Sequence, residues 1–274
     1  MASDDLPIGQ AIVLGLLHGP AELLPISSSG HIAVVPWLAG WDYSRLDGEL
    51  RKSFEVALHT GTAAALLISL RHEVDEAVRG LNPRRMLMIA LSFAPPAFVG
   101  YRFERPIERY LGTPPTVACG LFVGALAMAL ADRSPQERTH SDAGAADALW
   151  LGLAQACSLF PGVSRNGATL AAARWRRFTR VDANRLSRHA ALPIIAGATL
   201  LKGVRLRNRG MPPGAALPFV AGAGAAFVST LASTRLIRAL ERDSSLLPYA
   251  VYRIALAAVI AGKLVRRRGL PPTR

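Results

Sequence analysis

Five polar side chains between residues 18 and 31 have the types and spacing needed for acid–base and nucleophilic chemistry. His18 and Glu22 are four residues apart, so on a helix they share one face. Ser27, Ser28 and His31 follow them. A serine hydroxyl becomes a nucleophile when a base takes its proton, and a carboxylate can hold a divalent ion or move a proton. Glu22, Ser27, Ser28 and His31 are therefore candidate catalytic residues, and Glu22 and His18 are candidate metal ligands.

The same segment also has a purely structural interpretation. A histidine and a glutamate one turn apart can simply be a buried, hydrogen-bonded pair, and a serine-rich turn can cap the helix that follows. Capping and catalysis are compatible, because the N-terminus of a helix is also a site for anions.

A second polar segment, residues 161–169, has the composition of a phosphate-binding loop. Arg165 offers paired donors to phosphate oxygens, and the neighbouring glycines leave backbone N–H groups open to an anion. The alternative is an arginine that reaches toward the edge of a membrane. The candidate substrate-binding residues here are Arg165, Ser164, Gly162, Asn166, Gly167 and Thr169.

Both polar segments interrupt a chain that is otherwise a series of apolar runs. Hydrophobic residues make up 51% of the 274 positions, and a membrane span needs about 20 mostly apolar residues. The runs lack the two-residue alternation of a β-barrel. They predict an all-α, polytopic membrane protein with a single integral membrane domain over residues 1–274. The runs are 7–26, 56–70, 86–103, 115–131, 147–160, 189–204, 215–234 and 246–265.

The runs that precede the polar segments are short or broken, which predicts re-entrant helix pairs. Polar side chains at membrane depth are costly unless they line a functional cavity. Residues 14–16 and 151–153 both read Leu-Gly-Leu, and each precedes a proline and then serine and glycine. This indicates an inverted repeat with halves 1–131 and 147–274, joined by a polar linker, 132–146. A kink or break is also expected at Pro95 and Pro96.

The charge pattern supports a membrane and excludes nucleic acid as the partner. The formal net charge is +13, from 32 basic and 19 acidic residues. The basic residues are mostly arginines that cluster between the apolar runs, where they can contact anionic headgroups. The first seven residues lack the basic start of a signal peptide, so we expect the first apolar run to be retained.

Together these segments resemble the undecaprenyl-diphosphate phosphatase family, also called bacitracin-resistance proteins. The similarity rests on residues 22–31, which read Glu-Leu-Leu-Pro-Ile-Ser-Ser-Ser-Gly-His, and on residues 161–169. Shorter matches are Phe54-Glu55, Leu192-Pro193 and Tyr252-Arg253.

The resemblance implies a multi-pass enzyme of the bacterial inner membrane that hydrolyses undecaprenyl diphosphate to undecaprenyl phosphate and phosphate. That reaction recycles the lipid carrier of cell-wall synthesis. The family's motifs fall on Glu22, the pair Ser27 and Ser28, His31 and the phosphate-binding Arg165. The resemblance also implies a helical bundle with two re-entrant pairs, dependence on Mg²⁺ or Ca²⁺, and membrane lipids as surroundings. A homodimer is allowed.

The chain departs from the family at two positions. His18 stands where the family usually has Glu or Gln, and Asn166 stands where it usually has Ser. Histidine favours softer ions than Mg²⁺ or Ca²⁺, so the first change puts the metal in question. The nucleophile is open between Ser28 assisted by His31, His31 itself, and water activated by Glu22. The alternative function is a transporter or flippase that holds a polyprenyl phosphate lipid without cleaving it.

Overall fold

The computed structural model describes residues 6–209, 214–234, 236 and 244–268. Over these residues the chain forms α-helices and two short 3₁₀ helices, with no strand, so the all-α prediction is confirmed. In chain order the elements are α1 (Ile8–Leu23), α2 (Ser28–Ala39), η1 (Asp42–Arg45), α3 (Gly48–Ser69), α4 (Arg71–Arg79), α5 (Pro83–Leu111), α6 (Pro114–Ala131), η2 (His140–Asp142), α7 (Ala145–Cys157), α8 (Arg165–Trp175), α9 (Arg180–Arg209), α10 (Ala216–Ala232) and α12 (Leu247–Arg268).

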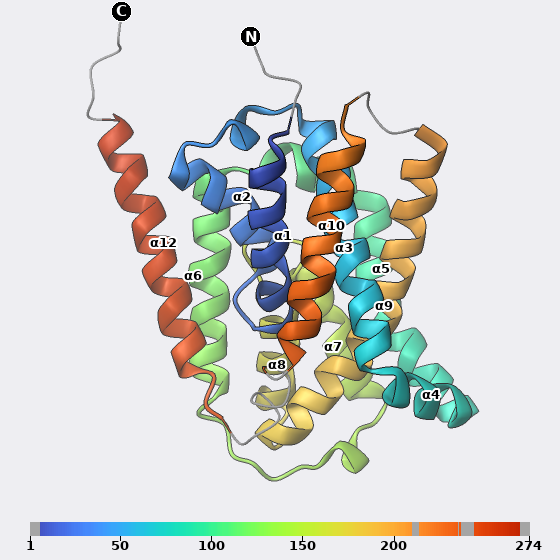
Figure 1. Cartoon of the computed structure of the whole chain (residues 1–274). Helices are drawn as coiled ribbons and strands as arrows, with labels where there is room; N and C mark the ends of the chain where they lie inside the picture. Colours follow the sequence, from blue (N-terminus) through green and yellow to red (C-terminus); the bar gives the residue numbers. More distant parts are fainter. Residues whose placement is uncertain (1–5, 210–213, 235, 237–243, 269–274) are drawn as a thin grey trace, which may run out of the picture.

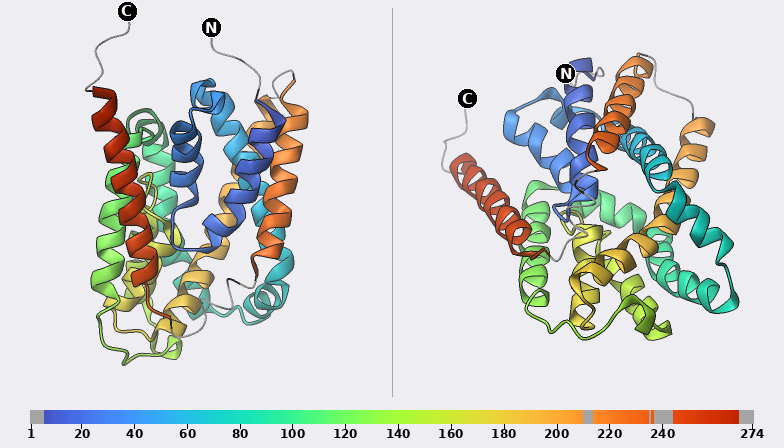
Figure 2. Two further views of the ribbon diagram at one scale, coloured as in Figure 1. Left: turned by 60° about the vertical axis from the view of Figure 1, so that its left-hand side comes forward. Right: turned by 60° about the horizontal axis from the view of Figure 1, so that its bottom comes forward.

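The helices lie roughly side by side as a bundle, and two short pairs turn back inside it. Figure 1 shows α1 running inward from one end of the bundle and α2 returning to that end, whereas α7 and α8 occupy the opposite end. The longer helices α3, α5, α6, α9 and α12 flank these pairs (Figures 1 and 2). The two turns, residues 24–27 and 158–164, therefore lie in the interior of the bundle.

Local sequence explains where several helices begin and end. Asp47 caps α3 by accepting a hydrogen bond from the Glu49 backbone N–H at 2.7 Å, and Asn82 caps α5 in the same way. A kink or break was expected at Pro95 and Pro96. The helix does not break there, because α5 continues as one helix through both prolines. Neighbouring helices can support a proline-containing helix in this setting.

Glycines allow α1 and α10 to pack closely. A side chain on Gly15 would meet the carbonyl oxygen of Gly222, and one on Gly19 would meet the backbone of Ser229 and Thr230. The Ser229 hydroxyl donates to the Gly15 carbonyl at 3.1 Å. Small residues at helix interfaces let backbones approach in membrane proteins, where packing and hydrogen bonds hold helices together.

The outer faces of the bundle are apolar. Within the part of the chain that the structure describes, three helices are long and apolar enough to cross a membrane, over Pro83–Phe103, Pro114–Ala131 and Leu247–Arg267, and Ala216–Ala232 is a shorter apolar helix. Large hydrophobic side chains on these helices are exposed, among them Phe98, Val220 and Val251. Exposed apolar surface of this extent fits a protein surrounded by lipid, so the chain is a membrane protein.

The predicted linker between the halves is a folded segment. Arg138 and Arg176 both donate to the buried carboxylate of Asp147, with nitrogen–oxygen distances of 2.7 to 2.9 Å. The Gly144 backbone N–H donates to the same carboxylate at 2.9 Å. These bonds fix the segment against the end of α8.

We predict that Gly15→Ala lowers the thermal unfolding midpoint in detergent, followed by helical circular dichroism. The added methyl group has no room against the Gly222 carbonyl, and overpacking of this kind costs about 1–3 kcal/mol. Gly9→Ala is the matched control, because a methyl group there meets nothing within 4 Å. Equal midpoints for the two variants would contradict close packing of α1 on α10.

Candidate active site

The turn between α1 and α2 brings the first group of polar side chains together. Ser27 has a φ of 76°, a conformation that non-glycine residues rarely adopt, and its side chain caps α2 by accepting from the Gly30 N–H at 3.3 Å. Ser27 is 2% exposed. Of the two predicted catalytic serines, Ser27 therefore shapes the turn, and Ser28 is the one whose hydroxyl faces the site.

The Glu22 carboxylate is the centre of the site. Its Oε1 lies 2.7 Å from Nη2 of Arg165, and its Oε2 accepts a hydrogen bond from the Ser28 hydroxyl at 2.5 Å. Glu22 and Arg165 are 143 residues apart in the chain. The structure thus brings together three of the predicted site residues, one from each of α1, α2 and α8.

The turn between α7 and α8 mirrors the first one in its capping. Ser164 caps α8 by accepting from the Gly167 N–H at 3.2 Å, and Arg165 is the first residue of the helix. The Gly167 N–H, which the sequence predicted to be open to an anion, is engaged by the Ser164 hydroxyl here, so its part in substrate binding stays a prediction. Gly162, with a φ of 92°, lies against the backbone of Val117 and serves close packing.

Two further predicted substrate-binding residues are engaged in joining helices. The Asn166 side chain donates to the Leu23 carbonyl at 2.8 Å and accepts from the Ser187 hydroxyl at 2.9 Å. Thr169 is fully buried, and its hydroxyl oxygen lies 2.6 Å from that of Ser187. Direct substrate binding by Thr169 is therefore not supported, since its hydroxyl pairs within the helix bundle.

His31 does not pair with Ser28, contrary to the expectation from the sequence. Its Nδ1 lies 2.7 Å from the Ser27 carbonyl oxygen, which can only accept, so Nδ1 carries a proton. In the neutral ring Nε2 then accepts from the Tyr252 hydroxyl at 2.7 Å, and the two rings stack. The base nearest to the Ser28 hydroxyl is Glu22.

Arg253 connects the two polar turns, a role that sequence reasoning missed. Its side chain is fully buried, and it donates to the carbonyls of Pro25 at 3.3 Å, Gly162 at 3.0 Å and Gly120 at 3.3 Å. One cation thereby binds both turns and α6. The sequence signals were the short family match Tyr252-Arg253 and a charged residue inside an apolar run, which more often marks a packing partner.

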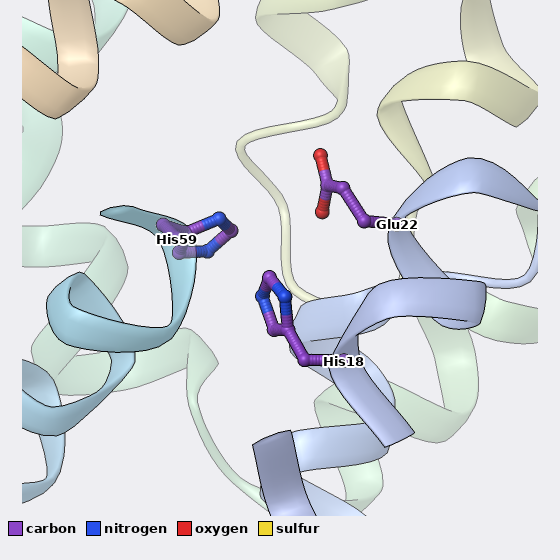
Figure 3. Close-up of side chains that lie close together, drawn as sticks. All are labelled: His18, Glu22 and His59. Atoms are coloured by element: carbon purple, nitrogen blue, oxygen red, sulfur yellow. The ribbon is translucent and has the colours of Figure 1, made fainter. Parts of the chain in front are cut away.

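His59 of α3 completes a group of possible metal ligands with His18 and Glu22. Figure 3 shows the three side chains converging from α1 and α3, and one ligand atom from each lies within 4.8 Å of the others. Mg²⁺ and Ca²⁺ prefer oxygen ligands, and this group offers one carboxylate and two imidazoles. The donor set therefore does not fit the metals that the family resemblance implies. His59 was not among the site residues predicted from the sequence.

A pocket extends from the charged pair along a wall that is mostly apolar, to which α9 also adds Asn184, Ser187 and Arg188. Glu22, Arg165 and Asn166 line its polar end, and α3 and α9 supply most of the remainder. The other lining residues are Leu23, Leu66, Leu70, Asn184, Ser187, Arg188, Ala191, Leu192 and Ile195. A ligand with a charged head and an apolar tail matches this distribution.

We predict that Arg253→Met lowers the thermal unfolding midpoint in detergent. The substitution keeps an unbranched apolar side chain but leaves three buried carbonyls without their donor, at a cost of about 1–3 kcal/mol each. Arg266→Met is the control, because Arg266 lies exposed on the same helix. Equal unfolding midpoints for the two variants would show that Arg253 does not hold the turns together.

Comparison with known proteins places this site in a family. A family model described as bacitracin resistance protein BacA matches residues 11–259. Proteins named undecaprenyl-diphosphatase from Geobacter sulfurreducens and Geobacter metallireducens are both 37% identical to the chain, covering 96% and 90% of it and 100% and 95% of their own lengths. One of the same name from Moorella thermoacetica is 36% identical over 94% of the chain and 98% of its own length. The chain therefore belongs to the BacA family of bacitracin resistance proteins.

Proposed function

We propose that this protein hydrolyses undecaprenyl diphosphate to undecaprenyl phosphate and inorganic phosphate, and so recycles the lipid carrier of cell-wall synthesis. The observation that carries the proposal is the Glu22 carboxylate, which binds both Arg165 and the Ser28 hydroxyl. A cation for phosphate, a base and a nucleophile then lie within one site. The names of the relatives support the same reaction.

In the proposed reaction Arg165 binds the terminal phosphate and Glu22 accepts the proton of Ser28. Arginine gives paired hydrogen bonds to phosphate oxygens, and such donors stabilise the charge that develops as phosphate is transferred. The Ser28 oxygen forms a bond to the terminal phosphorus as the bond to the bridging oxygen breaks, and undecaprenyl phosphate leaves. Water then cleaves the phosphoserine and releases phosphate, and the Ser28 hydroxyl is restored.

Two other nucleophiles stay compatible with the arrangement. Water activated by Glu22 would hydrolyse the diphosphate in one step, without a phosphorylated protein. His31 would attack through Nε2, which requires Tyr252 to give up its hydrogen bond. We favour Ser28 because its hydroxyl is already bonded to a carboxylate.

We further propose that the α1–α2 and α7–α8 pairs are re-entrant in a bacterial inner membrane that the chain crosses several times. Their internal turns and their position at opposite ends of the bundle support this topology and an inverted repeat of halves 1–131 and 147–274 (Figure 1). The apolar wall on α3 and α9 would take the start of the polyprenyl chain. Lipid, or a second copy in a homodimer, would cover the exposed outer faces.

A flippase that binds the same lipid without cleaving it is not favoured. A binding site needs the arginine but has no need of a serine hydroxyl held on a carboxylate. The relatives from Geobacter and Moorella are named for a diphosphatase activity.

We predict that the purified protein releases phosphate from undecaprenyl diphosphate in detergent and that Ser28→Ala lowers the rate by at least about 100-fold, because the nucleophile is lost. Ser29→Ala is the matched control, since Ser29 is the exposed neighbour on the same turn. A phosphorylated intermediate should be trapped on the wild type and absent from Ser28→Ala. Phosphate on His31 would overturn the role of Ser28, and no release by the wild type with any divalent cation would overturn the function.

A further inference from the structure

The group formed by His18, His59 and Glu22 is an unusual set of ligands beside a phosphate-binding arginine. His18 and Glu22 project from one face of α1, and His59 reaches them from α3 (Figure 3). Their ligand atoms lie within 4.8 Å of one another, a spacing that one ion can bridge. Two imidazoles and one carboxylate form a ligand set found in catalytic zinc sites and in other transition-metal sites.

Hydrogen bonding orients His18 toward this group. Its Nδ1 lies 2.9 Å from the Thr62 hydroxyl oxygen. The Thr230 hydroxyl is the donor to the Ala226 carbonyl at 2.7 Å and to the Thr62 hydroxyl oxygen at 3.3 Å, so Thr62 is itself held in place. Because Nδ1 of His18 is paired with Thr62, Nε2 is the ring nitrogen left for a ligand. Metal-binding histidines usually have their other ring nitrogen hydrogen-bonded in this way.

The second nitrogen of His18 is the independent sign of a missing ligand. His18 is 1% exposed, and its Nε2 has no hydrogen-bond partner among the residues that the structure describes. Buried polar atoms are nearly always paired, so an unpaired one needs an explanation such as an ion. Nε2 is therefore the atom of His18 available to a cation beside Glu22.

The charges around the group leave room for a cation. Both oxygens of Glu22 already accept one bond, from Arg165 and from Ser28, but each carboxylate oxygen has two lone pairs. The group has one negative charge and two imidazoles that are neutral when they bind a metal. His59 faces His18 edge to face, with the ring centroids 4.5 Å apart.

We propose that His18, His59 and Glu22 bind a divalent transition cation of the Zn²⁺ class, in place of the Mg²⁺ or Ca²⁺ that the family resemblance implies. Mg²⁺ and Ca²⁺ take oxygen ligands, whereas imidazole suits Zn²⁺, Co²⁺ and Fe²⁺. This proposal rests on the proposed function, because it names the cation of the same site. Metal binding is measured without substrate, so the metal proposal and the proposed hydrolysis can fail separately.

The test is a Co²⁺ titration of the full-length, untagged protein in detergent after removal of metal with a chelator. Co²⁺ reports nitrogen ligation through its visible absorption, and Zn²⁺ should displace it. We expect His18→Gln and His59→Gln each to weaken Co²⁺ binding by at least about tenfold. His72→Gln is the control, because His72 is exposed on α4, outside the site. Circular dichroism checks that each variant is folded.

A second variant tests the selectivity directly. His18→Glu supplies a second carboxylate, so we expect it to bind Mg²⁺ and Ca²⁺ more tightly than the wild type and Co²⁺ less tightly. The proposal is overturned if Co²⁺ binding is unchanged in the His18→Gln and His59→Gln variants, or if Mg²⁺ or Ca²⁺ displaces Co²⁺ from the wild type at equal concentration. Binding through the histidines in a protein that releases no phosphate would leave this site intact and overturn the proposed function.

Discussion

The ion pair between Glu22 and Arg165 joins the two halves of the chain at the centre of the bundle. Both side chains are mostly buried, at 12% and 18% exposure, where a single unpaired charge would be costly. Each partner is held by its own helix end, because α1 stops one residue after Glu22 and α8 starts at Arg165. The ion pair can therefore form only when the α1–α2 turn and the α7–α8 turn are both folded and lie next to each other.

Several other contacts maintain that meeting point. Arg253 donates to the carbonyls of Pro25 and Gly162, one from each turn, and Asn166 donates to the Leu23 carbonyl. Each of these bonds runs from a side-chain donor to a backbone carbonyl of a turn or helix end. Arg253 therefore only holds the turns together, whereas Asn166 both joins helices and lines the polar end of the pocket. In the proposed reaction the substrate meets Glu22, Ser28 and Arg165. Donors fixed before the reaction are the main source of stabilisation in phosphate transfer.

The sequence predicted the helices and the central site residues better than the long-range contacts between side chains. Apolar runs broken by polar segments predicted an all-helical protein, and the types of Glu22, Ser28 and Arg165 predicted the centre of the site. The pairing of His31 with Tyr252, 221 residues apart, has no local signal in the chain. His59 was equally hidden, because its role depends on how α3 packs against α1. Tertiary contacts also explain why Gly162 packs against Val117, and Gly167 against Arg253 and Met128, although glycines beside an arginine indicated phosphate binding.

The most direct test of the account is phosphate release from undecaprenyl diphosphate by Glu22→Gln, compared with the wild type in the same detergent. The amide keeps the size of the side chain but cannot take the Ser28 proton or balance Arg165. General base catalysis contributes about 10²–10⁴-fold to a rate, so we predict that Glu22→Gln releases phosphate at least about 100-fold more slowly than the wild type. Glu49→Gln, at an exposed position on α3, should behave as the wild type. Release by folded Glu22→Gln at the wild-type rate would contradict the central role of this carboxylate.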